Sequence, residues 1–386
     1  MLVIVDRLFL ITPVNRLETG RRPMEVIGIA GAGISGLTAA IHLARNGFPV
    51  RVYERGRDVA SRFKEEFQCF ENWTTDEDVL IFLDKIGISP DFYHRPFTEV
   101  ELIDDLERKY TIRSIDRAGL YIVKRGGEGD SIDQHLKREA LELGVEIQFG
   151  RSPEDKEVRI LGTGPESVRS VARGMRADVD SGDRIVILLD DRIAPKCYAY
   201  LIIVNGKMTL ASTLMKQFRR AKECFASTLE KVKRMYGLDP RNARPLTGYV
   251  DFSLRNSYVV DGRMLVGECA GLQDYLFGLG MRYALISGYL AARSIIEGLD
   301  YDQLVKGEMT NSLRSSLVNR YIFEKLGNRG YRRLIHRWNR SDDVLLLLRG
   351  WYGWRSCKGL LFPLARRWLD KKERARVQRR EWVTDG

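Results

Sequence analysis

The chain has 386 residues, of which 44% are hydrophobic, 10% aromatic and 30% charged. This length and composition predict a globular protein with one large or two interleaved domains, and they exclude a disordered or fibrous chain. No apolar run approaches the ~18 residues that a membrane-spanning helix needs. The five cysteines form neither a CxxC pair nor a Cys/His cluster, so we expect a cytoplasmic protein in a reducing compartment, with no metal site.

The positive charge is concentrated in one segment. Residues 311–386 contain 19 Lys/Arg and 7 Asp/Glu, a net charge of +12, which leaves −1 for residues 1–310. Five of the six tryptophans also lie in residues 311–386. The basicity therefore belongs to the C-terminal tail and predicts a partner of opposite charge there.

The first 23 residues are not typical of a folded segment or of a signal peptide. Asp6 and Arg7 interrupt a short apolar stretch, and no small-residue cleavage pattern follows. Met24 directly precedes the first predicted strand. We expect residues 1–23 to be a disordered extension and Met24 to be the natural start.

A strand, a glycine turn and a helix follow in the order typical of a dinucleotide-binding unit. Residues 25–30 read as a buried parallel strand, Gly31-Ala32-Gly33-Ile34-Ser35-Gly36 as the turn, and residues 37–45 as the helix. A second apolar strand, residues 50–54, ends in the acidic residue Glu54. The alternative is a glycine-rich turn without a ligand, but strand, helix and terminal acid together favour dinucleotide binding.

Each position in this unit has a physical role. Gly31 permits the tight turn, Gly33 lets the backbone approach a pyrophosphate, and Gly36 lets helix and strand pack closely. The N–H groups at the start of the helix hold phosphates, aided by the helix dipole. Glu54 is expected to bind the ribose hydroxyls and to repel a 2′-phosphate, which favours FAD or NAD over NADP.

Two further segments suggest a family. Residues 67–73 (Phe-Gln-Cys-Phe-Glu-Asn-Trp), with the preceding Arg62-Phe63, resemble the geranylgeranyl reductase-like branch of the flavin-dependent hydroxylase superfamily. That superfamily carries a strand ending in Gly-Asp, then Ala-Gly, a short loop and a long helix of small residues. Gly267-Glu268 resembles this pattern, with Glu in place of Asp, and the helix 282–296 follows it.

The resemblance implies that the dinucleotide is FAD, with Glu268 on its ribityl chain and the helix N-terminus near the flavin. It also implies that the strand 121–125 places Arg125 near the cofactor, the alternative being a solvated strand-end charge. A turn at residues 159–165 is similar to one that abuts the cofactor in many flavoproteins. The predicted FAD-binding residues are Gly31, Gly33, Ser35, Gly36, Glu54, Arg55, Arg62, Phe63, Arg125, Thr163, Gly164, Gly267, Glu268, Gly271, Gly278, Gly280 and Met281.

The expected fold is α/β, with a Rossmann-type FAD-binding domain interleaved with a mixed β-sheet substrate domain and followed by a helical C-terminal tail. The predicted segments are residues 24–105, 126–165 and 261–300 for FAD binding, 106–125 and 166–260 for the substrate domain, and 301–386 for the helical basic region.

The reaction is less clearly indicated than the cofactor. The window 163–170 lacks the Asp and the final Arg of the hydroxylase motif, which counts against an aromatic hydroxylase. The strand 198–203 resembles a substrate-domain strand of geranylgeranyl reductases without its Trp, Phe and Pro, so it either walls a polyprenyl-sized pocket or is simply core. The resemblance implies a reductase acting on carbon–carbon double bonds of an isoprenoid or lipid-like substrate. The alternatives are a monooxygenase or halogenase, and a flavin-binding protein without catalysis.

The sequence also gives expectations for the electron donor and for the partner of the C-terminal tail. A second strand–GxGxxG–helix unit is not found in the sequence, so NAD(P)H or a ferredoxin-type donor is expected to deliver electrons transiently. The four histidines are isolated and no catalytic side chain is assigned. The tail reads as helices 313–326, 331–338, 344–351 and 360–368, which suit either an anionic membrane surface or a cap on the pocket. Nucleic acid binding is not expected.

Overall fold

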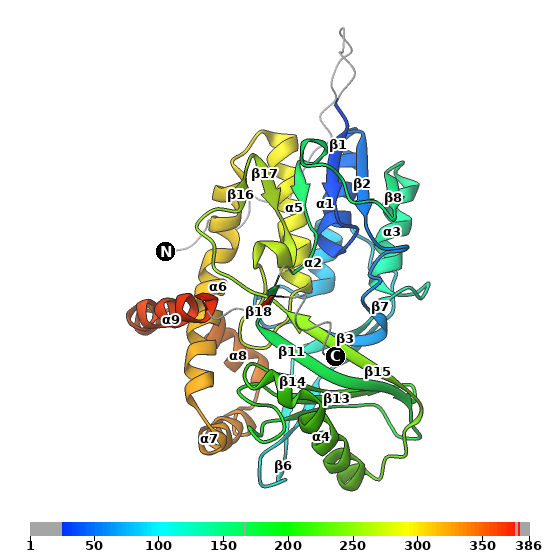
Figure 1. Ribbon diagram of the computed structural model, residues 1–386. Helices are drawn as coiled ribbons and strands as arrows, with labels where there is room; N and C mark the ends of the chain where they lie inside the picture. Colours follow the sequence, from blue (N-terminus) through cyan, green and yellow to red (C-terminus); the bar gives the residue numbers. More distant parts are fainter. Residues whose placement is uncertain (1–24, 166, 375–376, 379–386) are drawn as a thin grey trace.

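The computed structural model describes residues 25–165, 167–374 and 377–378. The predicted N-terminal extension and the start at Met24 lie outside the described residues. Figure 1 shows two halves, with a Rossmann-type sheet in the upper half and a larger sheet in the lower half. The long helix α6 (Tyr301–Lys325) runs down one side of both.

The upper half is a six-stranded sheet in the order β16-β17-β9-β1-β2-β8, parallel except for the β16–β17 pair. Its strands are β1 (Ile27–Ala30), β2 (Val50–Glu54), β8 (Glu146–Phe149), β9 (Ile160–Leu161), β16 (Val259–Val260) and β17 (Arg263–Leu265). All four residues of β1 are buried, as expected for a central parallel strand with both faces covered.

Helices pack closely on this sheet because glycines allow it. The helices are α1 (Ile34–Arg45), α3 (Ile132–Glu142) and α5 (Met281–Glu297). A Cβ atom on Gly36 would lie 2.0 Å from the backbone oxygen of Gly31, and one on Gly288 would lie 2.2 Å from that of Ser35. The contact between α1 and the turn, and that between α1 and α5, therefore both require glycine.

The lower half is a seven-stranded mixed sheet in the order β15-β11-β14-β13-β12-β5-β6, in which only β12 and β5 pair in parallel. Its strands are β5 (Glu99–Ile103), β6 (Lys109–Arg113), β11 (Ser170–Asp178), β12 (Arg184–Leu188), β13 (Ala199–Val204), β14 (Lys207–Leu214) and β15 (Arg241–Val250). Helix α4 (Ala221–Tyr236) covers one face through β11 and β14.

A small antiparallel sheet, β3-β7-β4, connects the two halves. It consists of β3 (Lys64–Glu71), β4 (His94–Phe97) and β7 (Leu120–Gly126), with α2 (Val79–Lys85) close by in the chain. A further two-stranded pair joins β10 (Ser167–Val168) and β18 (Val377–Gln378). Single turns of 3-10 helix occupy η1 (Asp155–Glu157), η2 (Phe218–Arg220) and η3 (Gly267–Ala270).

Three described C-terminal helices follow α6, of which the first two lie against the lower half. They are α7 (Asn328–Asn339), α8 (Val344–Tyr352) and α9 (Ser356–Arg374). Helices α7 and α8 contact β6, whereas α9 contacts α6. Of the helices that the structure describes, none is both long and apolar enough to cross a membrane.

The α/β fold class is confirmed, including the Rossmann-type unit, the mixed sheets and the helical C-terminal region. The first FAD-binding segment was predicted to extend to residue 105, but strand pairing assigns its last strand, β5, to the other sheet. Strand β5 pairs with β12 and β6 and so belongs to the substrate-side sheet. Sequence periodicity identifies a strand but does not say which sheet it joins. Helix α6 also begins at Tyr301, twelve residues before the helix predicted at 313.

Candidate active site

A cavity of about 960 Å³ lies between the two halves. One end is bordered by the glycine turn after β1 and the segment leading into α5, and the other by the lower sheet, α7 and α8. The cavity is therefore lined by residues far apart in the sequence, which the fold brings together.

The glycine turn forms an open cradle at the start of α1. Gly31 has φ +100°, and a Cβ atom there would lie 2.3 Å from the backbone oxygen of Gly162. A Cβ atom on Gly33, in contrast, would have no protein atom within 4 Å. Helix α1 has no side-chain cap at Gly33 and no acidic residue in its first turn, so the N–H groups of its first turn are open to a phosphate. This geometry fits a pyrophosphate.

Glu54 lies at the end of β2, beside this cradle. Its two carboxylate oxygens accept hydrogen bonds from the backbone N–H groups of Ala32 (3.0 Å) and Gly56 (2.7 Å). Each oxygen retains a lone pair, and Glu54 and Arg55 both line the cavity. The carboxylate is thus held where the adenosine ribose of a dinucleotide is expected.

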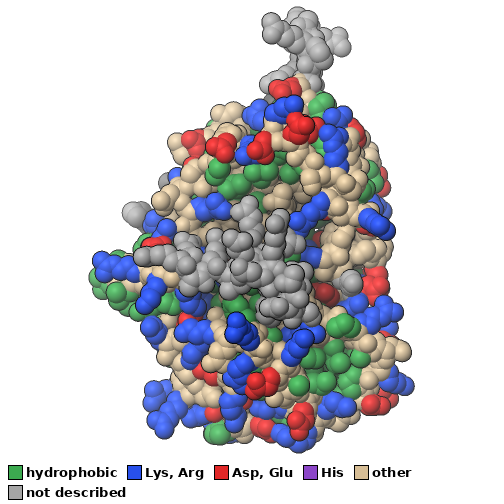
Figure 2. All heavy atoms as spheres, in the orientation of Figure 1, with side chains coloured by type: hydrophobic (Ala, Val, Ile, Leu, Met, Phe, Trp, Pro, Cys, Tyr) green, Lys and Arg blue, Asp and Glu red, His purple; other side chains and the backbone are tan. Residues whose placement is uncertain are grey.

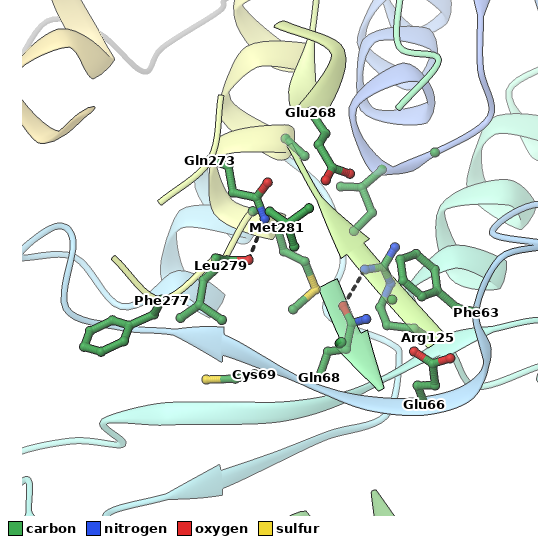
Figure 3. Close-up of a pocket in the computed structure, with 18 of the residues that line it drawn as sticks. Phe63, Glu66, Gln68, Cys69, Arg125, Glu268, Gln273, Phe277, Leu279 and Met281 are labelled. Atoms are coloured by element: carbon green, nitrogen blue, oxygen red, sulfur yellow. Dashed lines mark hydrogen bonds between the residues drawn. The ribbon is translucent and has the colours of Figure 1, made fainter. Parts of the chain in front are cut away.

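Arg125 is buried and held rigidly at the end of β7. It makes a bidentate pair with Asp133, with nitrogen–oxygen distances of 2.8 and 3.0 Å, and donates to the Gln68 side chain at 2.9 Å. Its guanidinium lies 4.2 Å from the centre of the Phe63 ring. Figure 3 shows the Gln68–Arg125 bond beside Phe63. Arg125 is therefore a fixed cation on the cavity wall and not a solvated strand-end charge.

Glu268 lies in the turn η3 and lines the cavity. It pairs with Arg62 at 2.7 Å and accepts from the Asp251 backbone N–H at 3.3 Å. Gly267 and Gly271 do not line the cavity but flank Glu268 in left-handed conformations, with φ +64° and +73°. A Cβ atom on Gly271 would lie 2.3 Å from the Ser253 hydroxyl, so these two glycines shape the turn rather than face a ligand.

The loop between η3 and α5 is organised by Asp274, a residue that the sequence did not single out. Its fully buried carboxylate accepts from the Phe277 backbone N–H (2.7 Å), from the Tyr352 hydroxyl (2.9 Å) and from Ser316. Burial raises the pKa of Asp274, while these hydrogen bonds act in the opposite direction. The loop is thereby tied to α6 and α8, and it carries Gly278, Gly280 and Met281 to the cavity.

The far part of the cavity is an apolar chamber. Alternate residues of the lower sheet point into it, as the two-residue period of a strand requires, and α7 and α8 close it. Its walls include Val100, Leu102, Ile112, Ile185, Ile187, Tyr200, Ile202, Trp338, Val344, Leu345 and Leu348. Of the charged lining residues that the structure describes, one group lies on the dinucleotide side: Glu54, Arg55, Arg62, Arg125, Asp133, Arg151, Asp155 and Glu268. Glu66 also lines the cavity and lies near Tyr200 of the chamber, whose pKa is raised by burial and by this carboxylate.

Two side chains lie where the dinucleotide end meets the chamber. Tyr198 lines the cavity and its hydroxyl donates to the backbone oxygen of Phe277 in the Asp274 loop. Cys69 lines the cavity from β3, and burial raises the pKa of its thiol far above the usual range. Cys69 is therefore a protonated thiol at neutral pH and not a thiolate nucleophile.

All other predicted FAD-binding residues lie along the same cavity. Ser35, Phe63, Thr163 and Gly164 line it, and Gly36 lies directly beneath the turn. The structure brings the three predicted segments together, although contact of each residue with the cofactor stays a prediction. The sequence did not identify Asp274 or the chamber residues of α7 and α8, because isolated acids and leucines carry no motif.

Comparisons with known proteins agree with this geometry. Residues 29–76 match the family model described as NAD(P)-binding Rossmann-like domain. A hydroxysqualene dehydroxylase of Sinorhizobium fredii is 31% identical over 101 residues, which are 26% of this chain and 24% of that protein. The chain thus matches about a quarter of the length of that curated relative.

Solved structures show the fold over nearly the whole chain. A geranylgeranyl bacteriochlorophyll reductase-like protein of Thermoplasma acidophilum is similar with a TM-score of 0.68 and 16% identity, over 84% of this chain and 96% of its own. The p-nitrophenol 4-monooxygenase of Pseudomonas putida is similar with a TM-score of 0.59 and 14% identity, over 86% of this chain and 100% of its own.

The chain therefore shares the fold of these two solved structures and contains a Rossmann-like dinucleotide-binding unit. Of these two, its fold resembles more closely that of the geranylgeranyl reductase-like protein. The predicted cofactor, FAD, agrees with both the cradle and these neighbours.

Proposed function

We propose that the protein reduces carbon–carbon double bonds of an isoprenoid or similar lipid-like substrate. The observation that carries the proposal is the chamber, whose walls beyond the dinucleotide end are apolar. An apolar chain gains free energy by leaving water for such walls, whereas a polar or charged substrate would lose its hydration without compensation.

The chemistry requires little of the side chains. When bound, reduced FAD supplies a hydride equivalent to one carbon of the double bond, and a proton must reach the other carbon. Two electrons come from NAD(P)H or from a ferredoxin-type protein that docks transiently. The chain's own residues hold the cofactor through the glycine cradle and Glu54, and they exclude water with the aromatic and aliphatic walls of the chamber.

Arg125 and the Asp274 loop position the two ends of the site relative to each other. Arg125 is fixed by Asp133 and Gln68 on one wall, and the Asp274 loop is fixed by α6 and α8 on the other. Such fixed walls keep the reacting atoms aligned, which is the main contribution that a protein makes to a cofactor-based reaction.

The second candidate is an oxygen-dependent reaction, because the fold is similar to that of a monooxygenase. This candidate includes a monooxygenase and a halogenase. Turnover without oxygen separates this candidate from the proposed reduction. FAD-loaded enzyme is reduced with dithionite in an oxygen-free cell and mixed with polyprenyl lipids, and the products are analysed by mass spectrometry.

A mass increase of two hydrogens per reduced bond, accompanied by reoxidation of the flavin absorbance, is the expected result. Product that appears only with oxygen, carrying an added oxygen or halogen, would replace the proposal with the second candidate. A flavin that no donor reduces would point to a binding protein without catalysis.

A further inference from the structure

Helix α9 is the part of the basic tail that does not build the cavity. One of its faces packs on α6: Ala365 and Leu369 are fully buried, the Trp368 ring lies 6.1 Å from that of Tyr321, and Lys372 pairs with Glu324 at 2.7 Å. This face anchors α9 to the body of the protein.

The opposite face of α9 exposes large apolar side chains. Leu360 is 81% exposed and Leu364 is 47% exposed. Residues four apart share one side of a helix, and Pro363 is exposed beside them. Single exposed leucines are ordinary on a protein surface, but two adjacent ones on a helix that already has a packed face leave a second apolar stripe, which no other described residue covers.

Basic side chains surround this stripe. Between Arg355 and Lys372 the sequence has six Lys/Arg and one Asp, and Arg355, Arg367 and Lys371 are exposed. Figure 2 shows hydrophobic and basic side chains together where α9 projects from the molecule in Figure 1. The surface therefore combines apolar contact with positive charge.

Helix α9 also contacts a helix that walls the apolar chamber. Lys358 of α9 donates to the backbone oxygen of Trp351 in α8, and the Trp351 ring lies 5.5 Å from that of Trp338, which lines the cavity. The buried side of α9 thus contacts α8, one of the two helices that wall the apolar chamber.

We propose that the exposed face of α9 binds the surface of an anionic phospholipid membrane. Leu360, Pro363 and Leu364 enter the boundary between headgroups and acyl chains. Arg367 and Lys371 of the same helix, and Arg355 just before its start, contact the lipid phosphates. This is the side-chain arrangement of helices that lie in the membrane interface. We define these six residues as the lipid face.

Other partners fit the lipid face less well. A nucleic acid would neutralise the basic residues but gains little from exposed leucines. A second copy related by two-fold symmetry would place the same positively charged helix against itself. An anionic membrane satisfies both the charge and the apolar stripe.

Binding to vesicles tests the proposal without any substrate. Its result is therefore independent of whether the protein reduces carbon–carbon double bonds. Full-length FAD-loaded protein is sedimented with vesicles of phosphatidylcholine alone, or of phosphatidylcholine with an equal amount of phosphatidylglycerol. We expect binding to the anionic vesicles only, weakened at high salt because the Debye length shortens to about 3 Å at 1 M.

Two double variants dissect the lipid face. Leu360→Glu with Leu364→Glu should reduce binding to background. Arg367→Gln with Lys371→Gln should weaken binding on the order of thirtyfold, since each basic residue contributes about fivefold at an anionic surface. The matched control, Leu141→Glu with Leu143→Glu at the end of α3, adds the same charge at exposed leucines elsewhere and should bind as the wild type does.

Point substitutions are preferable to a truncation after Asn328, because that truncation would also remove the chamber walls on α7 and α8. Flavin absorbance and the melting temperature verify that the variants are folded. Wild-type protein that ignores anionic vesicles would overturn the proposal, as would full binding by the Leu360/Leu364 variant. A concentration-dependent dimer that this variant abolishes would instead assign the lipid face to a second copy.

Discussion

The dinucleotide cradle and the apolar chamber are two ends of one cavity, but they are built in opposite ways. The cradle is local in sequence, and its function depends on backbone groups that glycine leaves accessible. The chamber is assembled from four strands and two helices, and its function depends only on apolar side chains that point inward. Polar recognition thus requires particular residues at fixed spacing, whereas apolar recognition requires only shape and volume.

The largest effect is expected from Gly33, where the cradle has to be free of side chains. Gly33→Val should weaken FAD binding by at least about a hundredfold, or roughly 3 kcal/mol, because the added atoms occupy the space of the pyrophosphate. The fold of the apoprotein should be unaffected, since no protein atom lies within 4 Å of the Cβ position. Titration of apoprotein with FAD, followed by flavin fluorescence, measures the effect.

Gly182 supplies the matched control for this substitution. A Cβ atom there would also have no protein atom within 4 Å, and the residue lies in the loop between β11 and β12 of the lower sheet. Gly182→Val should therefore bind FAD normally. Wild-type affinity in Gly33→Val would mean that the phosphates bind elsewhere.

A smaller effect, confined to the chamber, is expected at Leu348. This side chain faces the cavity from α8, and Leu348→Trp should fill part of the chamber and reduce affinity for long apolar ligands by about tenfold, with FAD binding unchanged. Displacement of an environment-sensitive apolar dye measures this without knowledge of the substrate.

Leu346 provides the control on the same helix, because it is 59% exposed on the outer side of α8. Leu346→Trp should leave dye binding unchanged. Equal effects of the two variants would show that α8 does not wall the ligand site as described.

The last effect acts on stability and not on ligand binding, and it is expected from His42 in the Rossmann half. Burial, with a further contribution from Arg45, lowers the pKa of His42 to about 3. Below pH 6.5 the unfolded chain binds a proton at this residue that the folded chain does not, so stability falls as the pH falls from 6.5 towards 3. The loss should be about 2 kcal/mol between pH 6.5 and 5.

Urea unfolding at several pH values measures this loss. His42→Leu should flatten the pH dependence over that interval, whereas His336→Leu, at an exposed histidine on α7, should leave it in place. An unchanged slope in His42→Leu would place the acid sensitivity at other groups.

The contrast between cradle and chamber also explains which features the sequence predicted. Strand β1, the glycine turn and Glu54 were predictable because their chemistry is fixed by spacing within thirty residues. The run Val344-Leu345-Leu346-Leu347-Leu348 predicted a helix, but nothing in it distinguishes Leu348, which faces the cavity, from Leu346, which faces solvent. That distinction depends on where β6 lies, which is a property of the tertiary structure.

Asp274 illustrates the same limit for a polar residue. Its carboxylate accepts hydrogen bonds from Ser316 and Tyr352, which are 42 and 78 residues away in sequence. A single acid between apolar residues carries no sign of such distant partners. The sheet membership of β5 was likewise set by its pairing with β12, which lies more than eighty residues later.

The ties made by Asp274 determine when this protein is able to mature during synthesis. The Asp274 loop, which lines the cavity, is fixed by Tyr352 on α8, whereas the glycine cradle leaves the ribosome more than three hundred residues earlier. At ~5–20 residues per second the cradle waits on the order of tens of seconds for its counterpart. The nascent chain must therefore remain soluble without its complete cofactor site until α8 has been synthesised.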